Sequence, residues 1–312
     1  MSSATSQSAP SSELVITTFN VQNLFPATSD PDITKAGVIT PESEARKRRK
    51  LALAVQQELE LPAIIALQEI GDEIILSTLA AEINAAAGTR YAGAAPPTSD
   101  RRGIRLGFLW DERRVQLDNL EQLQGADVAA AFGPSSPNPG REPLIGIFTA
   151  GACRIVIVNN HFKSNFIPEA NLHLAEQMLL ANAAQRRAQA AVLQAFAAAR
   201  LATDPQEWLL ITGDFNDGST APDSPLGRLL RGEPQLIHLL FAAGIRDYTF
   251  MREGETQLLD HMLASPAMAA ACTAVTVRHF NSHVHPALAL DPTTPARSSD
   301  HDALEARFTL TG

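Results

Sequence analysis

The short apolar runs of this sequence constrain its fold more than any other feature. Runs over residues 13–19, 63–69, 154–161 and 208–214 are rich in apolar residues, and each is long enough for one buried strand. They are far shorter than the roughly 20 residues that a membrane-spanning helix needs. We therefore expect buried strands and no membrane span.

The order of the predicted elements indicates the fold class. Further strands are expected over 103–111, 143–149, 258–265, 273–280 and 303–310, helices over 41–60, 72–87 and 169–202, and loops over 26–41, 121–142 and 281–298. Several strands follow one another with no helix between them, which disfavours one parallel sheet. The pattern predicts an α/β (α+β) protein of two packed mixed sheets with helices outside.

Length and termini suggest one main unit. A chain of 312 residues suits one large domain or two small ones. We expect a single domain over 13–312, preceded by a Ser-rich disordered segment over 1–12. That segment lacks the basic and apolar regions of a signal peptide, so we expect a cytoplasmic protein, or a secreted one if a leader has been removed.

Charge and cysteine content exclude some classes of function. The net charge of −9 argues against a broad basic surface that coats nucleic acid, but a metal-dependent nuclease remains compatible because a metal site gathers carboxylates. We interpret the basic run 46–50, and Arg186 and Arg187, as solvated helix faces rather than substrate contacts. Cys153 and Cys272 lack zinc-site spacing and are expected to be buried free thiols, with a single disulfide left open.

Polar clusters stand at the ends of five strand-like runs. Their members could meet at one edge of the sheets, although a lone Asp after a strand is more often a turn former or helix cap. The residues that stand out are Asn20, Glu69, His161, Asp214, Asn216, Asp260, Asp300 and His301. Five such clusters in register with apolar strands favour a shared site over coincidence.

The residue types in these clusters suit hydrolysis assisted by a divalent metal. Glu69, Asp214 and Asp300 are hard oxygen ligands, and Asn20 and Asn216 add neutral oxygens. This set suits Mg²⁺, Mn²⁺ or Ca²⁺ better than zinc. His161 and His301 titrate near neutral pH, and Asp260 could orient a histidine ring. The chain has no P-loop and no GxSxG motif, which disfavours nucleotide-driven phosphoryl transfer and serine hydrolysis.

At these residues the sequence resembles the endonuclease/exonuclease/phosphatase superfamily, which includes DNase I, abasic-site endonucleases, neutral sphingomyelinases and inositol polyphosphate 5-phosphatases. The matching motifs, in the family's order, are TFNVQNLF at 18–25, LQE at 67–69, NNHFKS at 159–164, GDFND at 213–217, LDHMLAS at 259–265 and SSDHD at 298–302. The resemblance implies a four-layer, DNase I-like sandwich of two mixed β-sheets flanked by helices. The NNHFKS string is similar to a bacterial nuclease branch.

The resemblance also implies roles for these residues. Glu69 would be the principal metal ligand, with Asn20 beside it, and Asp300 would belong to the metal site or the phosphate site. Asp214 would orient or deprotonate the attacking water, and Asn216 would hold a phosphate oxygen or a ligand. His301, partnered by Asp260, would contact the scissile phosphate, and His161 would assist at a non-bridging oxygen or the leaving group.

Some positions depart from the pattern or allow two interpretations. Abasic-site endonucleases carry an acid where this chain has Gln22. Lys163 is as consistent with a phosphate contact as with a salt-bridged or solvated lysine. His283 and His285 are interpreted as exposed loop histidines rather than an accessory metal or substrate site.

Three functions remain open at this point. The leading hypothesis is a hydrolase that acts as a metal-dependent nuclease, an endonuclease or exonuclease cutting phosphodiester bonds of DNA or RNA. The alternative is a phosphoesterase for a lipid or small molecule, such as a sphingomyelin or inositol phosphate, which the acidic composition would suit. A non-catalytic binding module is less favoured, because none of the expected acids or histidines is missing. Substrate, metal and oligomeric state are not readable from the sequence.

Overall fold

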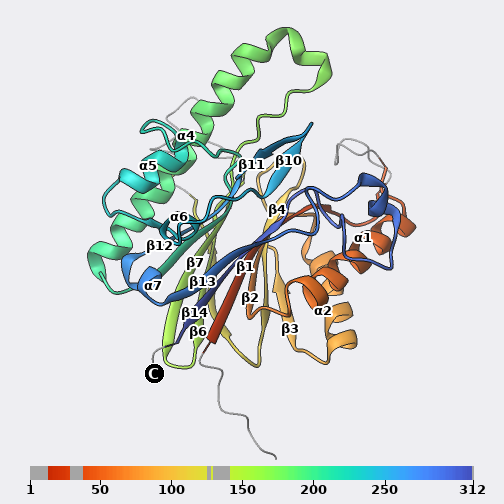
Figure 1. The fold of residues 1–312 in the computed structure, drawn as a ribbon, viewed down its shortest axis with the longest axis horizontal. Helices are drawn as coiled ribbons and strands as arrows, with labels where there is room; N and C mark the ends of the chain where they lie inside the picture. Colours follow the sequence, from red (N-terminus) through yellow and green to blue (C-terminus); the bar gives the residue numbers. More distant parts are fainter. Residues whose placement is uncertain (1–12, 29–37, 125–127, 129–140, 311–312) are drawn as a thin grey trace, which may run out of the picture.

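The computed structural model describes residues 13–28, 38–124, 128 and 141–310, so the predicted segment 1–12 lies outside the described residues. Two six-stranded sheets stack face to face, with helices on both outer sides (Figure 1). A separate hairpin consists of β10 (Phe250–Arg252) and β11 (Glu255–Gln257). The predicted class, two mixed sheets flanked by helices, is confirmed.

The first sheet contains both ends of the described chain. Its strand order is β13 (Cys272–Arg278), β14 (Ala303–Thr309), β1 (Glu13–Leu24), β2 (Ile64–Ile70), β4 (Arg105–Asp111) and β3 (Tyr91–Ala94). β1 pairs parallel with β2 and antiparallel with β14.

The second sheet contains the middle of the chain. Its order is β5 (Gln116–Gln122), β6 (Leu144–Ala150), β7 (Cys153–His161), β8 (Trp208–Asp214), β12 (Asp260–Ala264) and β9 (Ile237–His238). β7 and β8 are parallel, whereas β8 and β12 are antiparallel. Both sheets are therefore mixed.

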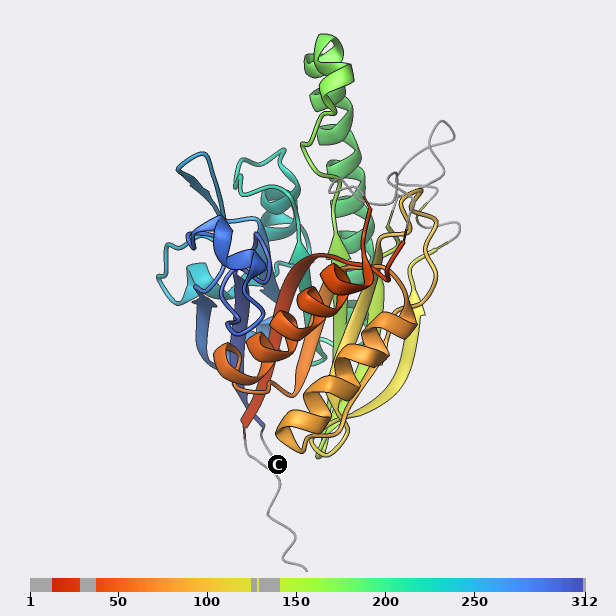
Figure 2. The ribbon, with the colours of Figure 1, turned by 90° about the vertical axis from the view of Figure 1, so that its right-hand side faces the viewer.

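The helices cover the outer faces of the sandwich. Against the first sheet lie α1 (Pro41–Leu53), which continues as the π-helical turn η1 (Ala54–Glu58), and α2 (Glu73–Ala87) (Figure 2). Against the second lie α4 (Ala175–Thr203) and α5 (Pro225–Arg231). Shorter elements are η2 (Glu169–Leu174), α6 (Leu239–Ala242), α7 (Pro266–Ala270) and η3 (Pro286–Leu290).

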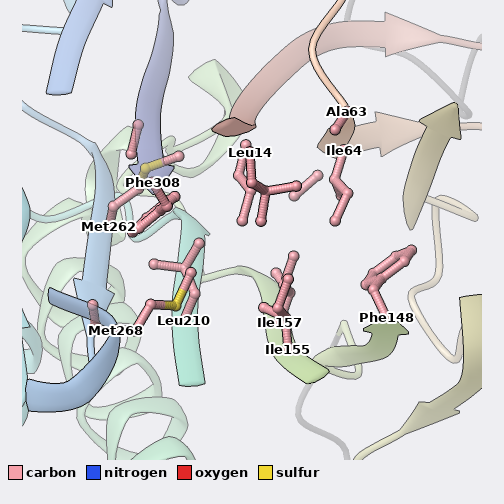
Figure 3. Close-up of a cluster of buried hydrophobic side chains, with 14 of the residues drawn as sticks. Leu14, Ala63, Ile64, Phe148, Ile155, Ile157, Leu210, Met262, Met268 and Phe308 are labelled. Carbon is pink, nitrogen blue, oxygen red and sulfur yellow. The ribbon is translucent and has the colours of Figure 1, made fainter. Parts of the chain in front are cut away.

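Alternation along the strands divides the apolar side chains between the layers. On β2, Ile64 faces the core between the sheets and Ile65 faces the helices. Figure 3 shows Leu14 and Ile64 of the first sheet facing Leu210, Ile157 and Phe148 of the second across the central core. These buried layers fix the register of the strands, and thus the relative position of their polar ends.

Several sequence interpretations need correction. The run 46–50 is not simply a solvated face: Lys50 is buried and Lys47 is half-buried. Arg186 is also buried, 5% exposed, because it pairs with Asp217 and donates to backbone and side-chain oxygens nearby. In both places another segment of the chain covers the helix.

Other expectations concern strands, thiols and the membrane. β5 was not predicted because its residues are largely exposed and polar, and much of the expected loop 121–142 lies outside the described residues. Cys153 and Cys272 are free and half-buried. In the part of the chain that the structure describes, we find no helix with the length and apolar character needed to cross a bilayer.

Candidate active site

Strand register brings the predicted residues to one end of the sandwich. In the first sheet, Asn20 on β1 aligns with Gln68, the residue before Glu69 on β2. In the second, Asp214 at the end of β8 aligns with both His161 on β7 and Asp260 on β12. Asn20 donates to Asp214, 194 residues further along the chain, so the two sheets contribute side chains to one site.

Two residues next to these side chains, Gly213 and Glu69, have a positive φ. Gly213 has φ +130°, and a Cβ there would lie 2.0 Å from the Asn160 carbonyl oxygen, so only glycine fits. Glu69 has φ +68° at an irregularity in the pairing of β2, a left-handed conformation that is costly for a non-glycine residue. Strained backbone of this kind often occurs where side chains are held for function.

Asp214 is the centre of the hydrogen-bond network. Its carboxylate accepts from Asn20 Nδ2 at 3.0 Å, Asn216 Nδ2 at 3.1 Å and the Asn216 backbone N–H at 2.8 Å. Burial raises the pKa of Asp214 to about 7, an effect that His301 opposes and Asp260 reinforces. A carboxylate with a pKa near neutrality can exchange a proton at working pH.

His301 is paired with Asp260. Its Nδ1 lies 2.7 Å from Asp260 Oδ2, and its Nε2 lies 3.9 Å from Asp214 Oδ2. Burial alone would lower the pKa of His301, but Asp260, Asp214 and Asp300 together raise it well above its ordinary value. The ring is therefore oriented by one carboxylate and presents its second nitrogen towards another.

His161 and Glu69 complete the buried ring of polar groups. His161 Nε2 lies 3.4 Å from Asp214 Oδ2 and 3.9 Å from Glu69 Oε1. Glu69 Oε2 accepts from the Asn23 backbone N–H at 3.0 Å, and Oε1 lies 3.5 Å from Asn20 Nδ2. The Glu69 carboxylate is thus held in place while part of it stays exposed.

The donor set fits a divalent cation. Glu69 and Asp300 offer carboxylates, the oxygen ligands that Mg²⁺, Mn²⁺ and Ca²⁺ prefer. Asp300 is half-buried and accepts no hydrogen bond from any residue that the structure describes, so its oxygens are available. Asp214, Asp260 and His301 also offer ligand atoms within 4.8 Å of one another. Asn20 turns its amide nitrogen towards Glu69, and its role as a ligand stays a prediction.

Cationic side chains lie beside the carboxylates. Lys163 is half-buried near Arg102, Arg141 and Arg186, and within the described residues its ammonium has no salt bridge. Arg102 donates to Asn23 Oδ1 at 3.1 Å and lies within electrostatic range of Glu69. Sequence reasoning missed Arg102, because an arginine in a turn carries no pattern that separates it from a solvated one.

A buried polar layer beneath the site was also missed. Gln68 donates to Asn159 at 2.7 Å and to Thr18 at 3.0 Å, and Asn159 donates to carbonyl oxygens of Leu67 and Gly107. These bonds join the two sheets directly below Glu69 and His161. The two consecutive asparagines at 159–160 and the glutamine before Glu69 could have been noticed in the sequence. Their residue types do not show whether they hold the site in place or take part in catalysis.

The loop histidines that the sequence singled out, His283 and His285, make contacts of their own. His283 is exposed, with a ring centroid 5.8 Å from that of His279, and His285 accepts the Ala287 backbone N–H at the start of η3. Asp302, His279 and His283 have ligand atoms close enough together to hold a metal ion. The oxygens of Asp302, however, already accept from His279 and from the backbone of 280–282, which indicates that Asp302 stabilises this turn.

Comparison with known proteins agrees with this architecture. Catalytic-domain human Nocturnin with bound sulfate has a TM-score of 0.61 and 15% identity, with 96% of this chain and 95% of that one covered. An endonuclease/exonuclease/phosphatase from Bacteroides vulgatus gives 0.62 and 14%, covering 96% and 99%. TDP2 of D. rerio in complex with single-strand DNA product gives 0.58 and 16%, covering 95% and 98%.

These likenesses establish the fold, and the sequence itself establishes the family. No curated protein matches the chain significantly. A sequence model of the Endonuclease/Exonuclease/phosphatase family matches residues 17–301, which include every residue of the ring described above. Members of this family are hydrolases of phosphoester bonds and generally use a divalent metal. The chain belongs to the endonuclease/exonuclease/phosphatase family.

Proposed function

We propose that this protein is a divalent-metal-dependent nuclease that hydrolyses phosphodiester bonds of DNA or RNA. The observation that carries the proposal is that the Asp214 carboxylate and the Asp260–His301 pair lie next to each other in one buried site. Asp214 accepts three hydrogen bonds and has a pKa near neutrality, and the Asp260–His301 pair lies 3.9 Å from it. A base beside an oriented imidazolium can accept the proton of an attacking water and stabilise charge on a phosphoryl oxygen.

The roles follow from the atoms that each residue presents. Asp214 orients a water and accepts its proton, while Asn20 and Asn216 hold the carboxylate in position. His301 donates from Nε2 to a phosphoryl oxygen, and Asp260 stabilises its charged form. His161 faces the same space and can donate to a second oxygen.

A divalent metal would be held by Glu69 and Asp300. It would polarise the phosphate and offset the negative charge that develops during attack. The imidazolium form of His301, which the raised pKa of this residue favours, and the ammonium of Lys163 add to that stabilisation from the protein side.

Turnover assays test this proposal. We expect purified protein with Mg²⁺, Mn²⁺ or Ca²⁺ to cleave plasmid DNA or RNA and EDTA to abolish cleavage. Asp214→Ala and His301→Ala should each lower the rate by about 10²- to 10⁴-fold. Asp223→Ala and His173→Ala are the matched controls, because Asp223 and His173 are exposed. Intact nucleic acid after incubation with metal-loaded wild type would refute the nuclease proposal.

Metal binding can be tested without turnover. Mn²⁺ titration followed by calorimetry should give weaker binding in Glu69→Gln and in Asp300→Asn than in wild type, with exposed Glu73→Gln as the control. Equal affinity in all four proteins would place the metal elsewhere.

A phosphoesterase for lipids or small molecules is the second candidate, and the net charge of −9 favours it because a long polyanion is repelled by an acidic surface. Release of phosphocholine or inorganic phosphate without cleavage of nucleic acid would select it. The printed partner of the TDP2 neighbour, single-strand DNA product, supports the first candidate.

A further inference from the structure

A hollow of about 280 Å³ lies between α1, the end of β1 and η3. We call it the α1 hollow; residues that line it include Gln22, Phe25, Arg46, Lys47, Leu290 and Arg297. Its volume is several times the roughly 30 Å³ of one water molecule. The hollow can therefore hold a chemical group much larger than a simple ion.

The α1 hollow adjoins the carboxylates of the candidate active site. Asn23 also lines it, and the backbone N–H of this residue donates to Glu69 Oε2. Lys47 lies within electrostatic range of both Glu69 and Asp300. A substrate bound at those carboxylates can thus extend into the hollow.

The hollow is positively charged in a protein whose net charge is negative. Arg46, Lys47, Lys50 and Arg297 line it, against the single acid Glu44. That acid is already paired with Arg48, which also binds Glu82. The excess of cations indicates an anionic occupant.

Two of the cations remain available for a ligand. Arg46 is half-buried and forms no ion pair with any described residue, and Lys47 donates to the Ser298 carbonyl oxygen with further N–H groups to spare. Lys50 and Arg297, by contrast, direct their hydrogen bonds to backbone carbonyls. Lys50 and Arg297 therefore shape the hollow, whereas Arg46 and Lys47 can bind.

The apolar lining suggests what is attached to the anion. Phe25 is buried and Leu290 is 68% exposed, so the hollow is lined by apolar as well as cationic side chains. A nucleotide combines a phosphate with an apolar ring face, and both features find a counterpart here.

We propose that the α1 hollow binds the nucleotide next to the scissile bond, with Arg46 and Lys47 holding the neighbouring phosphate. This inference rests on the phosphoesterase activity proposed above and specifies its substrate: a strand with at least two consecutive phosphates. An isolated phosphodiester would leave the hollow empty.

Three probes of increasing length test the inference: bis(4-nitrophenyl) phosphate, a dinucleoside monophosphate and a tetranucleotide. Arg46→Gln/Lys47→Gln removes both charges but keeps hydrogen-bonding amides. Arg49→Gln/Arg90→Gln is the matched control, because both arginines are largely exposed and the net charge changes equally.

We expect wild type to prefer the tetranucleotide over the dinucleoside monophosphate in kcat/KM. The Arg46→Gln/Lys47→Gln variant should lose about 30-fold of that preference, chiefly through KM, and the control less than about threefold. An equal loss on all three probes, or no loss on any, would overturn the inference.

A binding measurement separates this inference from the activity. In EDTA, the Kd of a fluorescein-labelled tetranucleotide should rise about tenfold in the variant, and the slope of log Kd against log salt should fall by about 1 to 2. If metal-loaded wild type cleaves none of the probes, the nuclease proposal fails. A higher Kd in the variant than in wild type would then still support nucleotide binding in the α1 hollow, and an equal Kd would overturn it.

Discussion

Lys50 is a buried cation that links α1 to the segment leading into the candidate active site. Its Nζ lies within 2.9 Å of four carbonyl oxygens, those of Leu288, Asp291, Thr294 and Ala296. The side chain is 1% exposed, and its burial lowers its pKa. Because His301 follows only a few residues later, we expect Lys50→Met to loosen this segment and to reduce activity.

The magnitude follows from the hydrogen bonds. An ammonium has three N–H groups, and a hydrogen bond to a charged group contributes about 1.5–3 kcal/mol. Three such bonds contribute about 7 kcal/mol, and burying the ammonium costs several kcal/mol, taken as about 4. Methionine keeps the apolar stem, so the expected loss in free energy of unfolding is about 3 kcal/mol.

Urea unfolding monitored by circular dichroism measures this loss, and hydrogen exchange over residues 286–298 shows whether the segment opens by itself. Arg49→Met is the matched control on the same helix. Arg49 is 48% exposed, with one long contact of 3.7 Å to Glu82, and its loss should cost under about 0.5 kcal/mol. A change below about 1 kcal/mol in Lys50→Met, together with unaltered exchange over 286–298, would refute the reasoning.

Three further predictions concern buried groups of the second sheet and the site. Burial and a neighbouring histidine lower the pKa of His238 to about 2. The stability that its neutral form contributes is present above pH 6.5 and declines below that pH, by up to about 1.4 kcal/mol per pH unit. Urea unfolding between pH 7 and 4 should therefore show a shallower decline in the free energy of unfolding for His238→Gln than for wild type. Asp260→Asn removes the charged partner of His301 and should lower kcat by about 10²- to 10⁴-fold in a cleavage assay. Gly213→Ala forces a methyl group against the Asn160 carbonyl and should destabilise the fold by more than about 4 kcal/mol in thermal unfolding.

Each of these predictions has a clear contrary result. Identical pH slopes for His238→Gln and wild type would show that this histidine is not neutral in the folded state. A loss in kcat below tenfold for Asp260→Asn would argue against an oriented imidazolium. Gly151→Ala is the control for Gly213→Ala, since its φ is also positive but no atom lies within 4 Å of the added Cβ; equal destabilisation of both would attribute the effect to φ alone.

The sequence could predict the strands that carry the site because burial on both faces leaves a local pattern. The apolar runs before Glu69, His161 and Asp214 correspond to β2, β7 and β8. β5 was not predicted because its residues are largely exposed and polar and therefore form no apolar run.

Side-chain partners depended on contacts that no local pattern encodes. The proximity of Asp260 to His301 was expected from the family resemblance, and the structure gives it as a 2.7 Å contact. The roles of the site residues stay predictions. Lys50, in contrast, was interpreted as solvated because its carbonyl partners lie about 240 residues away in sequence.

The sequence by itself determined the buried strands, the presence of helices outside them and the acids and histidines available at the strand ends, since each of these depends on neighbours close in the chain. Only the tertiary structure decided which of those groups lie together and how their surroundings shift their pKa values. Strand register places Asp260 and His161 beside Asp214, and burial raises the Asp214 pKa to about 7. It also placed Arg46 and Lys47 at a hollow beside the carboxylates, because the segment that encloses them packs there from the far end of the chain.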